Sequence, residues 1–243
     1  MHDGAMHACG HDGHTAMLLG AACHLAAKGD FNGRIVFIFQ PNEKHGHSAG
    51  AMIDDGLFQR FPADAVFAMH NIPGMKAGSF ATRAGPMTAS ESLFELSVTA
   101  RGGHAALPHM GVDAILVGAQ LVTALQSIVS RKLDPARNGV VSITEFITDG
   151  SRNVLPPSAL LKGDARALSD DTNHAIEAHM RRIAAGIAAA HDVDITVTYD
   201  TIFPSLTNDA SAVSHAIAAA RTISDTVDPA CDAKLFSEDF AHM

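Results

Sequence analysis

The six residues from Arg34 to Phe39 read R-I-V-F-I-F and are apolar nearly throughout. This composition is typical of a strand that is covered on both faces, because neither side is left to water. A second such strand is predicted from Asp64 to Met69. Helices are predicted from about Thr15 to Lys28, and from Ser48 to Asp55 with Gly56 ending the second. This alternation of helices and strands predicts an α/β fold with a doubly wound parallel sheet.

The predicted elements change order from about Leu93 to β-α-β-β-α-β. We expect strands over 94–100, 140–147, 159–166 and 194–199, and helices over 112–131 and 171–190. Each helix carries one apolar stripe, so a split β-α-β sandwich can bury both stripes against one sheet. The two ends of such a sandwich lie close together, so it can be inserted into another domain. We therefore expect residues 93–205 to be inserted between 1–92 and 206–243. A further helix over 210–224, capped by Asn208 or Asp209, is expected in the last part.

The composition excludes several classes of protein. The 243 residues are 47% hydrophobic with a formal net charge of −9, and the apolar runs are shorter than the roughly 20 residues of a membrane span. The 17 basic residues are scattered, which argues against a nucleic-acid partner. Three cysteines are too few for a disulfide framework, and Met1 is followed by no signal-peptide pattern, so a cytoplasmic location is expected. The 15 histidines direct attention to metal binding and proton transfer.

One thiol and three imidazoles lie in the run M-H-A-C-G-H-D-G-H from Met6 to His14. Cys9 and His11 are two positions apart, so in an extended backbone both side chains point the same way and can share a metal ion. Glu43 and His70 follow the two predicted strands, at the carboxyl ends where open α/β sheets build their sites. Glu43 is a candidate general base, because a carboxylate beside a metal can activate water. Taken alone, His70 is better explained as a hydrogen-bonded core histidine.

Several motifs together resemble the hippurate hydrolase-like amidohydrolases, which are metallopeptidases related to aminoacylase and to carboxypeptidases of the carboxypeptidase G type. The motifs are M-H-A-C-G-H-D-G-H, F-Q-P-N-E (39–43), M-H-N-I-P-G-M (69–75), G-G-H-A-A-L-P-H (102–109), R-N-V-L-P (152–156) and S-E-D-F (237–240). The resemblance implies two divalent metal ions (zinc, manganese, cobalt or nickel) and hydrolysis of the amide bond of small N-acyl amino acids or dipeptide-like substrates. It also implies a catalytic α/β domain interrupted by a β-α-β-β-α-β, ferredoxin-like lid that forms a homodimer.

The resemblance implies a role for individual residues near the metals. Cys9, His11 and His70 match metal ligands, and Glu43 matches the base that deprotonates the water between the metals. The family carries a second glutamate ligand at the next position, where this sequence has Lys44. An ammonium in place of a carboxylate changes the local charge by two units beside a dication, so at least one metal is expected to bind weakly.

Two ways of restoring the missing ligand are conceivable. His45 or His47 can replace it, or carbamylation of Lys44 can restore a carboxylate and add a measurable mass.

Three further residues match family positions outside the metal motifs. His104 matches a histidine that reaches the partner subunit's site and steadies the oxyanion. Asn153 and Arg166 match positions that bind the substrate carboxylate.

Both ends of the sequence differ from the family pattern. Family members have an earlier portion that supplies strands of the same sheet, and they carry a last histidine ligand beyond S-E-D-F. His242 comes too early to match that ligand. We therefore expect an incomplete doubly wound sheet with an exposed edge that favours association.

Three functions remain open from the sequence. The first is a metal-dependent amidohydrolase, impaired by Lys44 and by the missing ends. The second is a non-catalytic fragment that keeps only the dimerisation module. The third is a cysteine hydrolase with Cys9 as nucleophile, whose activity would resist chelators and be lost on alkylation.

Overall fold

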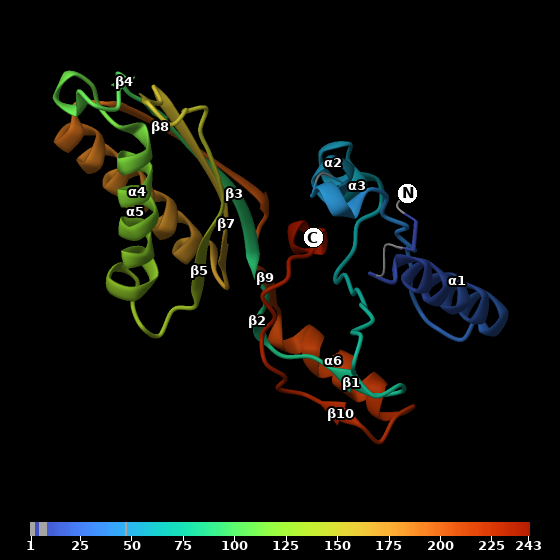
Figure 1. The fold of residues 1–243 in the computed structure, drawn as a ribbon. Helices are drawn as coiled ribbons and strands as arrows, with labels where there is room; N and C mark the ends of the chain where they lie inside the picture. The colour runs from blue at the N-terminus through green and yellow to red at the C-terminus, as the bar shows by residue number, and fades with distance from the viewer. Residues whose placement is uncertain (1–2, 5–8, 47) are drawn as a thin grey trace.

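The structure, a computed structural model, describes residues 3–4, 9–46 and 48–243. Its largest unit is a four-stranded antiparallel sheet with the strand order β5-β7-β3-β8. The strands are β3 (Ser90–Thr99), β5 (Gly139–Ile147), β7 (Ser158–Ala167) and β8 (Asp194–Phe203). Helix α4 (Ala114–Ser127) lies between β3 and β5 in the chain, and helix α5 (Asp170–His191) lies between β7 and β8. Both helices cover the same face of the sheet (Figure 1), and the elements follow the expected β-α-β-β-α-β order.

Apolar stripes on the two helices form the core of this unit. Leu121 and Leu125 of α4, with Ile176 and Met180 of α5, are fully shielded from water. They pack in one cluster with every second residue of β3, which are Phe94, Leu96 and Val98. Burying apolar area stabilises a fold by about 25 cal/mol per Å², so these two facing stripes explain why this part of the chain folds as the sequence predicts.

The two helices of this unit begin at side-chain caps. Asp113 accepts hydrogen bonds from the backbone N–H groups of Ile115 and Leu116, and Ser169 accepts one from Thr172. A π-helical turn, Ile128–Lys132, extends α4. The resulting segment Ala114–Lys132 is long and apolar enough by composition to cross a membrane. Its apolar stripe is packed against the sheet instead, as in the core helix of a folded domain.

The strands predicted over 34–39 and 64–69 are absent, and that prediction was wrong. Neither segment pairs with a strand in the described part of the chain, and Phe39 and Phe67 are 48% and 58% exposed. Arg34 Nη2 donates a hydrogen bond to the carbonyl oxygen of Pro62, just before the second segment, at 2.8 Å, and this contact is made by a side chain rather than by strand pairing. A strand exists only beside a neighbour that takes up its N–H and C=O groups. Apolar composition does not supply that neighbour.

Most of the remaining helices and strands come before β3 or after β8 in the chain. They are α1 (His11–Lys28), α2 (Ser48–Asp54), α3 (Leu57–Arg60), β1 (Phe80–Ala81), β2 (Gly85–Thr88), β9 (Leu206–Asn208), α6 (Ala210–Arg221) and β10 (Val227–Asp228). Short 3₁₀ turns are η1 (Glu43–His45), η2 (Pro108–Met110) and η4 (Asp239–His242). The first predicted helix therefore starts four residues earlier than expected, and α3 was not predicted. Asp209 caps α6, as expected.

The C-terminal part of the chain returns to the segment just before the sheet. Strand β10 pairs in parallel with β1, and β9 pairs antiparallel with β2. The last residues run from there to η4, which lies between the sheet and the N-terminal elements (Figure 1). This return brings the S-E-D-F motif next to segments from the first 70 residues. The division into 1–92 with 206–243 and 93–205 stays a prediction.

Candidate metal centre

Cys9, His11 and His70 bring one sulfur and two imidazoles together at the start of α1. Their donor atoms all lie within 4.8 Å of one another, and Cys9 Sγ is 3.8 Å from His70 Nε2. In a tetrahedral site, Zn–S and Zn–N bonds of about 2.3 and 2.0 Å separate sulfur from nitrogen by roughly 3.5 Å. The three donors therefore fit a single divalent ion with little movement.

The His70 ring is held in the orientation that a ligand needs. Its Nδ1 lies 2.6 Å from the carbonyl oxygen of Asn71. A carbonyl only accepts, so the hydrogen is on Nδ1 and the Nε2 lone pair is directed toward Cys9. Burial lowers the pKa of His70 and also that of His11. Both rings are therefore neutral at physiological pH, which is the form that binds metals.

His14, the third imidazole of the motif, has a supporting position. Its Nε2 accepts a hydrogen bond from the backbone N–H of Asn71 at 3.1 Å, and its ring centroid lies 4.3 Å from that of His70. Gly10 precedes α1 with φ +84°, and a Cβ there would overlap the Asn71 side chain. The glycine between Cys9 and His11 is thus required by the close approach of the His70 loop.

Glu43 lies beside the three donors, in the η1 turn. Its Oε2 is 3.6 Å from His11 Nε2 and 3.3 Å from Lys44 Nζ. The atom is shielded from water, and among the described residues no donor reaches it in hydrogen-bonding geometry. A buried carboxylate oxygen without a donor is a place for a water molecule or a substrate group. Glu43 can therefore act as a base toward a molecule bound there.

Lys44 points back into the centre rather than away from it. Its Nζ donates to Cys9 Sγ at 3.1 Å, besides the ion pair with Glu43. Burial opposes the charged form, but the hydrogen bond to Cys9 and the Glu43 carboxylate outweigh it and raise the pKa of Lys44. The ammonium thus lies beside Cys9 and Glu43, the sulfur and carboxylate that a second ion would need, and the donors of the described residues do not fit that ion. His47 and the side chain of His45, the substitute ligands considered above, lie outside the described residues.

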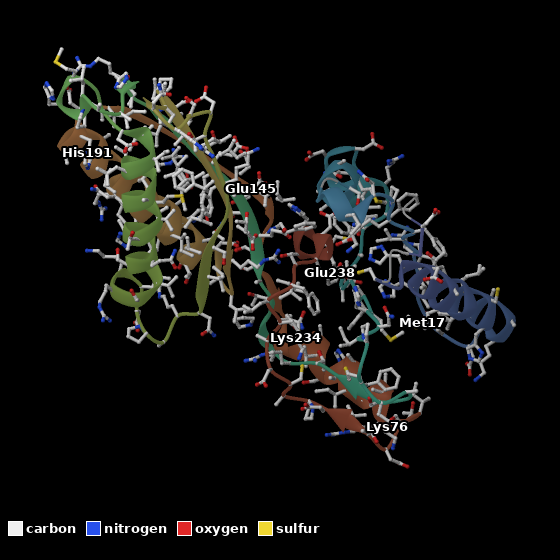
Figure 2. All side chains as sticks on the ribbon, in the orientation of Figure 1. Met17, Lys76, Glu145, His191, Lys234 and Glu238 are labelled. Atoms are coloured by element: carbon white, nitrogen blue, oxygen red, sulfur yellow. The ribbon has the colours of Figure 1, made fainter. Side chains whose placement is uncertain are left out.

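Glu238 was not predicted as a site residue. Figure 2 shows it on the C-terminal segment, between the sheet and the N-terminal elements, and its Oε1 lies 3.4 Å from His70 Nε2. Burial, and then the nearby Glu43 charge, raise the pKa of Glu238 to about 7. Glu238 belongs to the S-E-D-F motif of the sequence. The motif alone does not show that this residue contacts His70.

Asp239, the next residue, fixes the turn that carries Glu43. Its side chain is fully buried, and Oδ2 accepts hydrogen bonds from Gln40 Nε2 at 2.8 Å and from the backbone N–H groups of Ser48 at 3.1 Å and Ala49 at 2.8 Å. The Ser48 hydroxyl donates a further one at 2.8 Å. One carboxylate therefore holds the chain before and after Glu43, and it stabilises the beginning of α2.

Arg166, expected to bind a substrate carboxylate, is engaged within the chain. Its guanidinium pairs with Glu91 at 2.9 Å and Asp164 at 2.8 Å. It also donates to the Leu235 carbonyl and to Ser237 Oγ, both at 3.1 Å. These contacts join β7 to the segment that carries Glu238, so Arg166 supports the metal centre indirectly. Direct binding of substrate by Arg166 stays a prediction.

His104 and Asn153 lie near each other but away from the three metal donors. Strand β4 (Gly103–His104) pairs with β6 (Val154–Leu155), and the backbone N–H of Ala105 donates to the Asn153 carbonyl at 2.9 Å. Figure 1 places β4 at the end of the sheet far from α1. Within one chain, these two residues are therefore not part of the centre. Their roles in substrate binding stay predictions.

Comparisons with known proteins identify the family of the chain. A sequence model of peptidase family M20/M25/M40 matches residues 1–243. The chain is 40% identical over 221 residues to the hippurate hydrolase of Campylobacter jejuni, and 37% identical over 219 residues to an N-acetylcysteine deacetylase of Bacillus subtilis. The alignments cover 91% and 90% of this chain but 57% of each relative.

Solved structures give the same result. A putative aminohydrolase from methicillin-resistant Staphylococcus aureus superposes with a TM-score of 0.89 at 37% identity, over 98% of this chain and 63% of the other. A dinuclear metal-binding peptidase of the M20 family from Bacillus subtilis superposes with a TM-score of 0.82 at 32% identity, over 99% of this chain and 61% of the other. The chain thus spans about three fifths of the length of the proteins that it resembles.

Proposed function

The chain belongs to peptidase family M20/M25/M40, and from this premise we propose that it carries the catalytic centre of a metal-dependent amidohydrolase acting on N-acyl amino acids. The observation that supports this most directly is the convergence of Cys9, His11 and His70 beside Glu43 Oε2. A sulfur, two neutral imidazoles and a buried carboxylate oxygen without a hydrogen-bond donor form a ligand set next to a base.

The chemistry follows from these groups. A divalent cation held by Cys9, His11 and His70 would supply Lewis-acid polarisation of the amide carbonyl and activation of water. Glu43 accepts the proton of the attacking water at Oε2 as the oxygen–carbon bond forms. It then returns that proton to the amide nitrogen as the carbon–nitrogen bond breaks. Family membership, including that of a dinuclear metal-binding peptidase, supports divalent metals as cofactors. The choice among zinc, manganese, cobalt and nickel belongs to the proposal.

The substrate class is taken from the names of the relatives. Hippurate and N-acetylcysteine are both N-acyl amino acids with a free carboxylate. We propose a substrate of this class, of which hippurate is one candidate, recognised with help from His104, Asn153 and Arg166. We further propose that residues 93–205 act as a lid and dimerisation domain, and that the protein functions in the cytoplasm.

The test is a hydrolysis assay of the purified 243-residue chain on benzoylglycine and acetylated amino acids. We expect amine release that stops with a chelator and returns when a divalent metal is added. No turnover with any metal would refute the enzymatic proposal and favour the non-catalytic fragment. Turnover that survives chelation but is lost on alkylation would instead identify Cys9 as a nucleophile.

A further inference from the structure

The Lys44 side chain is a hydrogen-bond donor that lies next to two acceptors, the Cys9 sulfur and the Glu43 carboxylate. Its ammonium has three hydrogens to donate and no lone pair to offer a metal. One hydrogen is donated to Cys9 Sγ at 3.1 Å, and the charge of the ammonium pairs with Glu43 Oε2 at 3.3 Å. A sulfur and a carboxylate oxygen that lie close to one position are typical neighbours of a cation. Here the Lys44 ammonium is the cation at that position.

A second metal ion would compete for the same two atoms. An ion that shared the Cys9 sulfur would lie about 2.3 Å from Sγ and about 2.0–2.2 Å from a carboxylate oxygen. The Lys44 ammonium lies about one ångström farther from the same atoms, so a second cation would be in close contact with it and would be repelled by its charge. Lys44 is also adjacent to Glu43 in a short turn, and Asp239 holds the chain on both sides of that turn.

The remaining donors are sufficient for one ion. His11 and His70 lie together with the Cys9 sulfur, and the three donor atoms are within 4.8 Å of one another. The carboxylate of Glu238 contacts one of these donors, with Oε1 at 3.4 Å from His70 Nε2. A sulfur and two imidazoles, with a water molecule in the fourth position, form a complete set for a four-coordinate catalytic ion.

We propose that the Lys44 ammonium takes the place of a second metal ion, so that this chain binds one divalent cation, at Cys9, His11 and His70. The inference rests on the proposed function, because it concerns the ion that this function requires. It predicts that the Lys44 ammonium, which fills this position with a positive charge and offers no lone pair, sets the number of ions. A carboxylate at this position would then admit the second ion.

The experiment counts metal ions per chain. The wild-type chain, Lys44→Glu and Lys76→Glu are dialysed against zinc and measured by elemental analysis and native mass spectrometry. We expect one ion in the wild type, two in Lys44→Glu, and one in Lys76→Glu. Lys76 lies away from the donors, in the loop before β1 (Figure 2), so this control makes the same change in charge without changing the centre.

Cobalt provides a second readout that separates this inference from the proposed function. Cobalt(II) bound to a cysteine sulfur gives a charge-transfer absorption, which Cys9→Ser must remove. Two ions in the wild type, or one in a folded Lys44→Glu, overturn the inference and leave the proposed function standing. The absence of any absorption that depends on Cys9 overturns both.

A second variant covers the case in which Lys44→Glu does not fold. Lys44→Gln removes the charge and adds an amide oxygen as a weaker donor. We expect it to take a second ion with lower affinity than a carboxylate would give. A folded Lys44→Gln chain that still binds one ion at saturating zinc overturns the inference.

Discussion

Gln40 and Asp239 lie 199 positions apart, and their side chains are joined by a 2.8 Å hydrogen bond from Gln40 Nε2 to Asp239 Oδ2. The same carboxylate oxygen also accepts from the backbone at Ser48 and Ala49. The C-terminal motif therefore belongs to the metal centre in two ways. Glu238 contacts His70, and Asp239 fixes the turn of Glu43.

Asp239→Asn tests this bracing of the Glu43 turn. The amide retains the size of the side chain, but the charged acceptor of several buried hydrogen bonds is lost. We expect the free energy of unfolding to fall by about 2–3 kcal/mol, with weaker zinc binding, measured by urea denaturation and by competition with a chelator. Asp55→Asn is the control, because the Asp55 side chain is 81% exposed. An equal loss in the two variants would contradict a special role for Asp239.

Glu43→Gln tests the base. The amide cannot take up a proton, so we expect kcat to fall by about 10²- to 10⁴-fold while the number of bound metal ions is unchanged. Steady-state kinetics with elemental analysis measures both quantities. Glu145→Gln, on the exposed outer part of β5, should have wild-type kcat. A Glu43→Gln chain with wild-type kcat would remove Glu43 from the mechanism.

Metal removal is expected to lower thermal stability. An ion that binds only the folded chain stabilises it by about 2.7 kcal/mol at a concentration one hundred times its Kd, which corresponds to roughly 5–10 °C in Tm for a chain of this size. Differential scanning calorimetry with and without zinc measures this shift. His70→Ala should abolish the shift, and His24→Ala, on the exposed part of α1, should retain it. A zinc-dependent shift that survives in His70→Ala would place the ion elsewhere.

Tyr199 should make the chain less stable at high pH. Burial raises the pKa of Tyr199 to about 12, and its hydroxyl donates to Asn173 Oδ1 at 2.7 Å. Between pH 10 and 12 the unfolded chain releases this proton and the folded chain retains it, so stability falls as pH rises. We expect a slope of at most about 1 kcal/mol per pH unit, reduced from the full linkage value because the ring is only partly buried.

Tyr199→Phe should lose this contribution to the alkaline slope. Urea denaturation of both proteins from pH 9 to pH 11.5 gives the comparison. At pH 7 the variant should be less stable by about 1 kcal/mol, the usual contribution of one hydrogen bond. Identical slopes in the two proteins would show that the phenol ionises equally in the folded and unfolded states.

Gly46→Ala tests the fit of the Glu43 turn against the sheet. Gly46 has φ +63°, and a Cβ there would meet the backbone carbonyl of Ile202 in β8. We expect a loss of roughly 1–3 kcal/mol, measured by thermal denaturation. Gly186→Ala in α5 is the matched control, because its Cβ would meet open space and alanine favours a helix by about 1 kcal/mol. Stabilisation by both substitutions would contradict the close packing at Gly46.

The sequence was most informative where the determining contacts are local. The stripes of α4 and α5 and the four strands of the main sheet, β3, β5, β7 and β8, were predicted within a few positions. In each of them, the pattern of buried and exposed side chains follows from the element itself. The two-residue strands β4 and β6, by contrast, were not predicted. Residues 34–39 have an equally clear composition, but a strand also needs a partner. That partner is not specified by the segment's own residues.

The candidate site divides in the same way. Cys9 and His11 were identified by spacing. Glu43 and His70 were noted at the ends of two predicted strands that the structure does not contain, and the family resemblance then gave both residues a role. Glu238 and Asp239 were quoted within a motif without a role, because their partners His70 and Gln40 are brought to them only by the folded chain. The position of Lys44 was noted as a difference in charge. Its contact with the Cys9 sulfur required the structure.

The unpaired segments around Phe39 and Phe67 should also differ from the main sheet in the rate at which their amide protons exchange. Amides of β3 are held between two neighbouring strands, so they exchange with deuterium only when the sheet opens. Amides of residues 34–39 have no such protection and should exchange first. If a binding partner placed a strand beside residues 34–39, deuterium uptake in peptides from this segment would slow. Such a change would therefore report the new strand pairing.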